Sequence, residues 1–153
     1  MKDNQEKIAI VLCGVQASGK TSFYQQNYAD KGYVHINLDT LHTRNKELLL
    51  MEDCAMRELS VVVDNTNPTI TDRKRYIDFF RNAGYKVMGF YFQSNVHECL
   101  KRNSNREHPV KDLAILGTYG KLKKPTMSEG FNELYYVAIV DNHFIINPWK
   151  DEI

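Results

Sequence analysis

Short apolar runs alternate along the chain with longer segments of helical periodicity. The first run covers residues 7–13 and leads into a glycine-bearing loop, and a later run at residues 60–64 contains three consecutive valines. Consecutive β-branched residues are typical of a strand that is buried on both faces. We expect strands at residues 7–13, 33–37, 60–64 and 86–92, and helices directly after the first loop and at residues 41–59, 69–83 and 96–103.

Strands that alternate with helices predict parallel pairing with right-handed crossovers. We therefore expect an α/β fold, a parallel sheet sandwiched by helices, in which ligands bind at the carboxyl ends of the strands. Residues 131–140 and 144–146 are expected to add closing edge strands. A length of 153 residues fits one self-sufficient core, so residues 1–153 are predicted to form a single domain.

Composition is that of a folded globular protein, with 42% hydrophobic and 25% charged residues. The net charge of +1 conceals a local excess, because residues 101–124 carry seven basic and two acidic side chains. Such a segment suits a polyanion or the phosphates of a nucleotide. The alternative is a solvated, lysine-rich helix face.

Three cysteines, at positions 13, 54 and 99, form no CxxC spacing and leave an odd thiol. This pattern argues against a disulfide framework and against a zinc site. The apolar run Ile8–Cys13 is too short for the core of a signal peptide or for a membrane span. We expect an intracellular protein without a membrane partner, and both cytoplasm and nucleus stay open.

Residues 14–21 satisfy the phosphate-loop pattern GxxxxGK[ST], between an expected strand and an expected helix. Backbone N–H groups of such a loop bind phosphates, while the lysine reaches the β- and γ-phosphates and the hydroxyl ligates Mg²⁺. The alternative is a glycine-rich turn with a surface lysine. No NKxD-type base-reading pattern follows, which disfavours a GTPase. The predicted nucleotide-binding residues of this loop are Gly14, Val15, Gln16, Ala17, Ser18, Gly19, Lys20 and Thr21.

Two aspartates follow expected strands and should lie at the same edge of the sheet. Asp39 follows the second strand, where a carboxylate can accept a proton from an attacking hydroxyl, although an aspartate there can also be an ordinary helix N-cap. Asp64 ends the third strand, where P-loop enzymes hold the hydration shell of Mg²⁺, although it also begins a turn in Asp-Asn-Thr-Asn-Pro.

Two arginines, Arg102 and Arg106, end a predicted helix and enter a loop. Arginine on a mobile loop neutralises charge during phosphoryl transfer. The alternative is a favourable interaction with the helix dipole.

Taken together, these motifs resemble the kinase domain of the polynucleotide kinase/phosphatase family. The resemblance runs from about residue 8 to 137, on the segments 14–21, 33–41, 64–68, 101–106 and 124–131. It implies a P-loop kinase fold with a basic helical lid, and transfer of the γ-phosphate of ATP, with Mg²⁺, to 5′-hydroxyl ends of DNA or RNA. The implied catalytic residues are Asp39, as general base, Lys20 and Arg106. The resemblance also implies that Arg102 and Arg106 contact the phosphates and that Thr21 and Asp64 bind the metal. The residues implied to contact the substrate are Asp39, Asp64, Asn65 and Thr66.

Two departures from the family change what we expect. The phage enzyme of this family has an arginine three residues after its general base, and His42 stands there in this chain, so contacts to the substrate phosphates are expected to differ. No DxDGT-type phosphatase motif occurs, so we expect no 3′-phosphatase activity and a separate phosphatase or ligase as partner. The alternatives are a P-loop kinase for a small metabolite or nucleoside, and a nucleotide-dependent binding module without chemistry.

Overall fold

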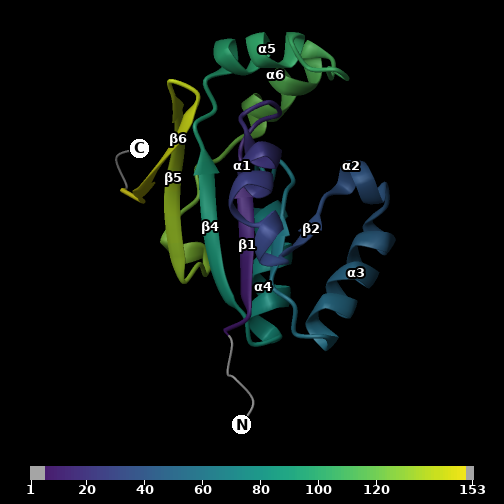
Figure 1. The fold of residues 1–153 in the computed structure, drawn as a ribbon. Coiled ribbons are helices and arrows are strands. Elements are labelled where there is room, and N and C mark those ends of the chain that lie inside the picture. The colour runs from purple at the N-terminus through teal and green to yellow at the C-terminus, as the bar shows by residue number, and fades with distance from the viewer. Residues whose placement is uncertain (1–5, 151–153) are drawn as a thin grey trace.

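The computed structural model describes residues 6–150, and its centre is one six-stranded sheet in the order β2-β3-β1-β4-β5-β6 (Figure 1). The first five strands of this order run parallel, and β6 is antiparallel to β5. The predicted α/β class is confirmed, with β6 as an antiparallel addition to the expected parallel sheet. The strands are β1 Ile8–Cys13, β2 Val34–Ile36, β3 Val61–Val63, β4 Lys86–Phe92, β5 Glu133–Val140 and β6 His143–Pro148.

Helices cover both faces of the sheet because alternate residues of the central strand point to opposite sides. Ala9 and Val11 pack with α3 and α4, whereas Ile10 and Leu12 pack with Phe23 of α1. All three valines of β3 are fully buried, as their sequence predicted. The helices are α1 Lys20–Asn27, α2 Leu38–Leu41, α3 Arg44–Met56, α4 Ile70–Asn82, α5 Val96–Ser104 and α6 Asp112–Lys121, with short 3₁₀ helices at Ala29–Lys31 and Met127–Glu129.

The bounds of α4 and β4 agree with those predicted from the sequence. Thr69 and Asp72 form a capping box that begins α4, and Gly84, with φ of 85°, follows its end. β4 spans the predicted residues 86–92. In this part of the chain the cap and stop residues were sufficient to set the element bounds.

The helix expected at residues 41–59 is confirmed as α3 Arg44–Met56, but its expected bounds are wrong. The helical conformation is interrupted at His42, which has φ of 70°, so the short helix α2 ends there before α3 begins. Each helix has its own cap, because the Asn37 side chain accepts from the Thr40 N–H and the Thr43 side chain accepts from the Lys46 N–H. The break places residues 38–41 in a separate helix above β2.

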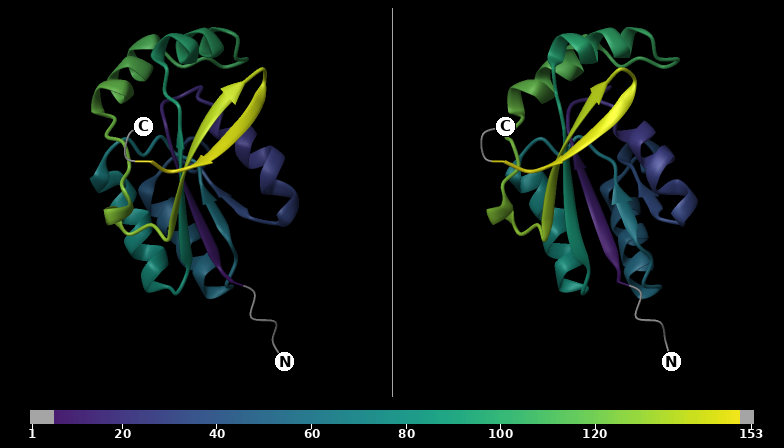
Figure 2. Two further views of the ribbon diagram at one scale, coloured as in Figure 1. Left: turned by 90° about the vertical axis from the view of Figure 1, so that its left-hand side faces the viewer. Right: turned by 60° about the vertical axis from the view of Figure 1, so that its left-hand side comes forward.

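Strands are confirmed within residues 131–140 and around residues 144–146, as β5 and β6, but β5 is not an edge strand, because it pairs with both β4 and β6. Only β6 lies at that edge of the sheet. The β5–β6 hairpin curls over the face that carries α1 (Figure 2), where the rings of Phe144 and Phe23 lie 5.4 Å apart. This packing draws β6 out of the plane of the parallel strands.

Two helices, α5 and α6, form a lid across the carboxyl ends of the strands (Figures 1 and 2). Val15 of the phosphate loop, Cys99 of α5 and Ile115 of α6 form a small buried cluster beneath the lid. α6 was not among the expected helices. In the described part of the chain, the helices lack the length and apolar character needed to cross a bilayer.

Candidate active site

A polar cleft of about 430 Å³ lies at the carboxyl ends of β1, β2 and β3, beneath the lid. Its walls come from the phosphate loop, α2, the loop after β3 and the lid, which are distant in sequence. The structure thus brings most of the predicted site residues together. Those that line the cleft are Gln16, Ala17, Gly19, Lys20, Thr21, Asp39, Asp64, Asn65, Thr66, Arg102 and Arg106.

Part of the phosphate loop does not line the cleft. The three predicted residues that face the protein instead are Gly14, Val15 and Ser18. The N–H of Gly14 donates to the carbonyl of Thr66 (3.0 Å), and the N–H of Val15 donates to the hydroxyl of Ser94 (3.2 Å). A Cβ on Gly14 would lie 2.9 Å from Cβ of Phe92, so only glycine allows this close approach. The amides of Gly14 and Val15 therefore shape the loop and face the protein.

Lys20 is almost fully buried at the floor of the cleft, and its Nζ donates to the carbonyl of Val15 (2.8 Å). Burial lowers the pKa of this ammonium, and the nearby Asp64 opposes the shift. A triphosphate in the cleft would supply the negative charge that stabilises the ammonium form. The buried ammonium at the floor of the cleft is therefore suited to an anionic ligand.

Ala17 adopts a left-handed conformation with φ of 63°, which glycine tolerates better than alanine. We expect Ala17→Gly to raise the free energy of unfolding by about 0.5–1 kcal/mol, after the greater entropy of glycine in the unfolded chain is included. Thermal denaturation should show a melting temperature about 2 °C higher. Ala83→Gly is the matched control, because φ of −87° there does not favour glycine. A lower melting temperature for Ala17→Gly would contradict the presence of strain.

Asp64 is buried at the end of β3, and one of its oxygens receives two hydrogen bonds. Thr21 Oγ1 donates to Asp64 Oδ2 at 2.7 Å, and His35 Nε2 lies 2.8 Å from the same oxygen. Burial alone would raise the pKa of Asp64, but the hydrogen bond from His35 and the charge of Lys20 outweigh it and lower the pKa. Asp64 therefore remains a carboxylate. A hydroxyl and a carboxylate are the hard oxygen donors that suit Mg²⁺ or its hydration shell.

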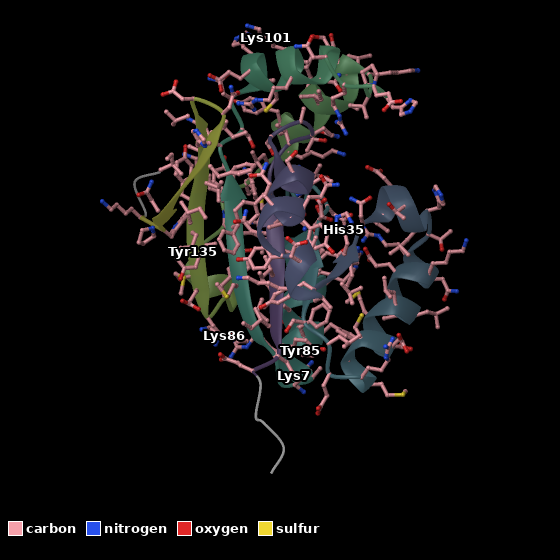
Figure 3. All side chains as sticks on the ribbon, in the orientation of Figure 1. Lys7, His35, Tyr85, Lys86, Lys101 and Tyr135 are labelled. Carbon is pink, nitrogen blue, oxygen red and sulfur yellow. The ribbon has the colours of Figure 1, made fainter. Side chains whose placement is uncertain are left out.

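His35 was missed as a site residue in the sequence. It lies on β2 beside α1 (Figure 3), and its neighbour in the sheet is Val62 of β3. The one signal in the sequence was a polar residue in the middle of an otherwise apolar strand.

Asp39 lies on α2, a helix of four residues, and its exposed side chain faces the cleft. The alternative that Asp39 is the helix N-cap is wrong, because Asn37 occupies that position. Its carboxylate is therefore free of the capping role and is available to a ligand. The helix itself is anchored by the N–H of Leu38, which donates to Oδ1 of Asn65 (2.9 Å).

Asn65 was expected on the substrate side, but its amide holds protein groups in place. Its Nδ2 donates to Oε2 of Glu47 (3.2 Å) and to the hydroxyl of Tyr76 (3.0 Å), while its Oδ1 accepts from Leu38. The Glu47 carboxylate is buried and also receives a hydrogen bond from Arg44 (2.9 Å). Burial, followed by the charge of Glu47, raises the pKa of Tyr76 to about 12. Asn65 thus connects the helix of Asp39 to a buried polar network.

Residues 64–68 join the parts of the cleft through backbone and side-chain hydrogen bonds. Besides the contact of Thr66 with the phosphate loop, Asn67 donates through Nδ2 to the carbonyl of Leu12 (2.8 Å). The carbonyl of Asn67 accepts from Arg73 (2.9 Å), and Arg73 pairs with Glu129 at 2.7 Å in the protein interior. The N–H of Lys123, where the chain leaves the lid, donates to the carbonyl of Pro68 (2.7 Å).

The lid places both predicted arginines at the cleft. Arg102 Nη1 donates to the carbonyl of Ala17 (3.3 Å) and Nη2 pairs with Glu98, so Arg102 contacts the phosphate loop from the last turn of α5. Arg106 lies just beyond that helix, and its charge contributes to the lowered pKa of Lys20. A further link was not predicted: Nε2 of Gln16 donates to the hydroxyl of Thr118 on α6 (3.0 Å).

Comparisons with known proteins confirm the resemblance drawn from the motifs. Residues 43–116 match a family described as AAA domain. The chain is 29% identical over 160 aligned positions to a bifunctional polynucleotide phosphatase/kinase of Schizosaccharomyces pombe, covering 98% of the chain and 39% of that protein. A putative bifunctional polynucleotide phosphatase/kinase of Acanthamoeba polyphaga mimivirus is 33% identical, over 95% of the chain and 37% of that protein. The chain therefore spans less than two-fifths of each of these relatives.

Solved structures with the same fold bear different names. A fungal RNA kinase superposes with a TM-score of 0.69 at 17% identity, over 97% of this chain and 40% of that one. A gluconokinase from Sinorhizobium meliloti superposes with a TM-score of 0.63 at 18% identity, over 88% and 84% of the two chains. At these sequence identities the structural similarity establishes the P-loop kinase-like fold. It does not identify the molecule that accepts the phosphate.

Proposed function

We propose that this protein is an ATP-dependent polynucleotide kinase that phosphorylates 5′-hydroxyl ends of DNA or RNA. The observation that carries the proposal is that Asp39 lines the same cleft as Lys20 and Thr21 of the phosphate loop. Two relatives named as polynucleotide phosphatase/kinases support a nucleic-acid acceptor. The cleft lies between the phosphate loop on one side and α2 on the other, an arrangement suited to a donor and an acceptor.

In the proposed reaction, ATP binds with its triphosphate along the phosphate loop. Thr21 and Asp64 are the residues that would hold Mg²⁺, which supplies charge neutralisation at the β- and γ-phosphates. Lys20 contacts the same phosphates through its ammonium, and Arg102 and Arg106 contact them from the lid. These side chains stabilise negative charge on the transferring group.

Asp39 accepts the proton of the acceptor hydroxyl as its oxygen attacks the γ-phosphorus. A new oxygen–phosphorus bond forms, and the bond from the γ-phosphorus to the β,γ-bridging oxygen breaks. The products are ADP and a 5′-phosphorylated end, with the proton on Asp39 until solvent removes it. Thr66 also lines the cleft and is proposed to contact the acceptor.

The test is transfer of a labelled γ-phosphate from ATP to matched 5′-hydroxyl DNA and RNA oligonucleotides, to nucleosides and to gluconate. We expect transfer to the oligonucleotides, and loss of transfer in Lys20→Met. Added salt should weaken oligonucleotide binding with a log–log slope of about −0.7 for each phosphate neutralised on a single strand. A preference for a nucleoside or for gluconate, with little dependence on salt, would overturn the polynucleotide acceptor.

The two relatives are named as bifunctional polynucleotide phosphatase/kinases. We propose a phosphatase or a ligase as a partner that acts on the same nucleic-acid ends.

A further inference from the structure

His35 does not line the cleft itself but contacts Asp64, which does. Its Nε2 lies 2.8 Å from Oδ2 of Asp64, the oxygen that also receives the hydroxyl of Thr21. The side chain of Asp64 is 2% exposed and that of His35 is 27% exposed, so the contact is largely shielded from water.

The chemistry of the three groups fixes the direction of each hydrogen bond. An ionised carboxylate is only an acceptor, so Nε2 of His35 carries the hydrogen in this contact. The hydroxyl of Thr21 has one hydrogen, which also points to Asp64. The lone pairs of the Thr21 oxygen therefore remain available to a cation, and Asp64 retains its second oxygen, Oδ1, for the cleft.

The ring of His35 is itself held in place. It stacks on Tyr24 of α1 with the ring centroids 4.3 Å apart and an interplanar angle of 8°. The hydroxyl of Tyr24 donates to the carbonyl of Tyr33 (2.7 Å), at the start of β2. The stack fixes the rotation of the imidazole, so the donor atom faces Asp64 before any ligand binds.

We propose that His35 is a positioning residue for the nucleotide-bound divalent cation and acts through Asp64. Outer partners of this kind set the orientation of the residues that contact a metal, and their loss typically weakens metal binding or activity by about 10–100-fold. The proposal rests on the magnesium-binding part of the proposed function and does not depend on the identity of the acceptor.

The test compares His35→Phe with His35→Gln. Phenylalanine keeps an aromatic ring for the stack on Tyr24 and removes the N–H donor, whereas glutamine supplies an amide donor in a side chain of similar reach. Binding of Mn²⁺ to each variant is measured by electron paramagnetic resonance in the presence of a non-hydrolysable ATP analogue. Binding of the analogue is measured separately in EDTA. His143→Phe, an exposed position on β6, is the matched control.

We expect His35→Phe to weaken Mn²⁺ binding by about 10–100-fold, with His35→Gln retaining most of the affinity. Analogue binding in EDTA should be unchanged in both variants, because the hydrogen bond of His35 goes to Asp64 and the metal is absent. Wild-type Mn²⁺ affinity in a folded His35→Phe variant would overturn the proposal. Equal loss in both variants together with a lower melting temperature would also overturn it, since His35 would then be only structural. Neither measurement involves an acceptor, so the result is independent of whether oligonucleotides are phosphorylated.

Discussion

Replacement of Asp39 by asparagine is expected to lower kcat for phosphoryl transfer by about 10²–10⁴-fold, the usual contribution of a general base. Asparagine has the same shape but cannot accept the proton of the acceptor hydroxyl. The side chain is exposed in the cleft, and α2 is held by its neighbours Asn37 and Leu38, so the fold should be unaffected. Steady-state kinetics with a saturating oligonucleotide measure the loss.

Binding of an ATP analogue should be unchanged in Asp39→Asn, because the proposed contacts to the nucleotide come from Lys20 and Thr21. Asp30→Asn serves as the control, since Asp30 is exposed on the 3₁₀ helix Ala29–Lys31 and does not line the cleft. If Asp39→Asn keeps most of the wild-type rate, another group accepts the proton and the proposed mechanism is wrong.

Removal of the Glu129 carboxylate is expected to lower the free energy of unfolding by about 3–5 kcal/mol, the usual effect of breaking a buried ion pair. Arg73 is fully buried and Glu129 is 5% exposed, so Glu129→Met leaves an uncompensated guanidinium in the interior. The loss should also reach the cleft, because Arg73 holds the carbonyl of Asn67. Urea denaturation followed by circular dichroism measures the change.

The same helix, α4, supplies a control. Lys74 and Asp78 form an exposed pair, with side chains 67% and 51% accessible, and Asp78→Ala should change stability by less than about 1 kcal/mol. The double variant Arg73→Met/Glu129→Met should recover part of the loss, because no unpaired charge remains. A small effect of Glu129→Met alone would mean that water reaches Arg73 after the substitution.

The sequence was informative wherever short-range chemistry decides the structure. The capping pair Thr69 and Asp72 and the glycine at position 84 set the bounds of α4, and the valines of β3 identified a buried strand. The phosphate loop and the aspartates after β2 and β3 were placed at one cleft because parallel strands end at the same edge.

Features that depend on distant partners could not be predicted. His42 adopts a positive φ although it is not glycine, so no glycine in the sequence marks the end of α2. Asn65 lies in a turn motif, and only its partners Leu38 and Glu47 give it the role of an anchor. The contact of His35 with Asp64 requires the pairing of β2 with β3.

Both sides of the cleft are attached to the same short segment, residues 64–66. The helix with Asp39 is fixed to the carbonyl of Asp64 and the amide of Asn65, and the phosphate loop is fixed to the carbonyl of Thr66. The lid is attached to the chain beyond this segment, at Pro68, and to the phosphate loop through Arg102 and Gln16. Because one short segment holds both walls, the spacing between Asp39 and the phosphate loop is set locally, at the end of β3.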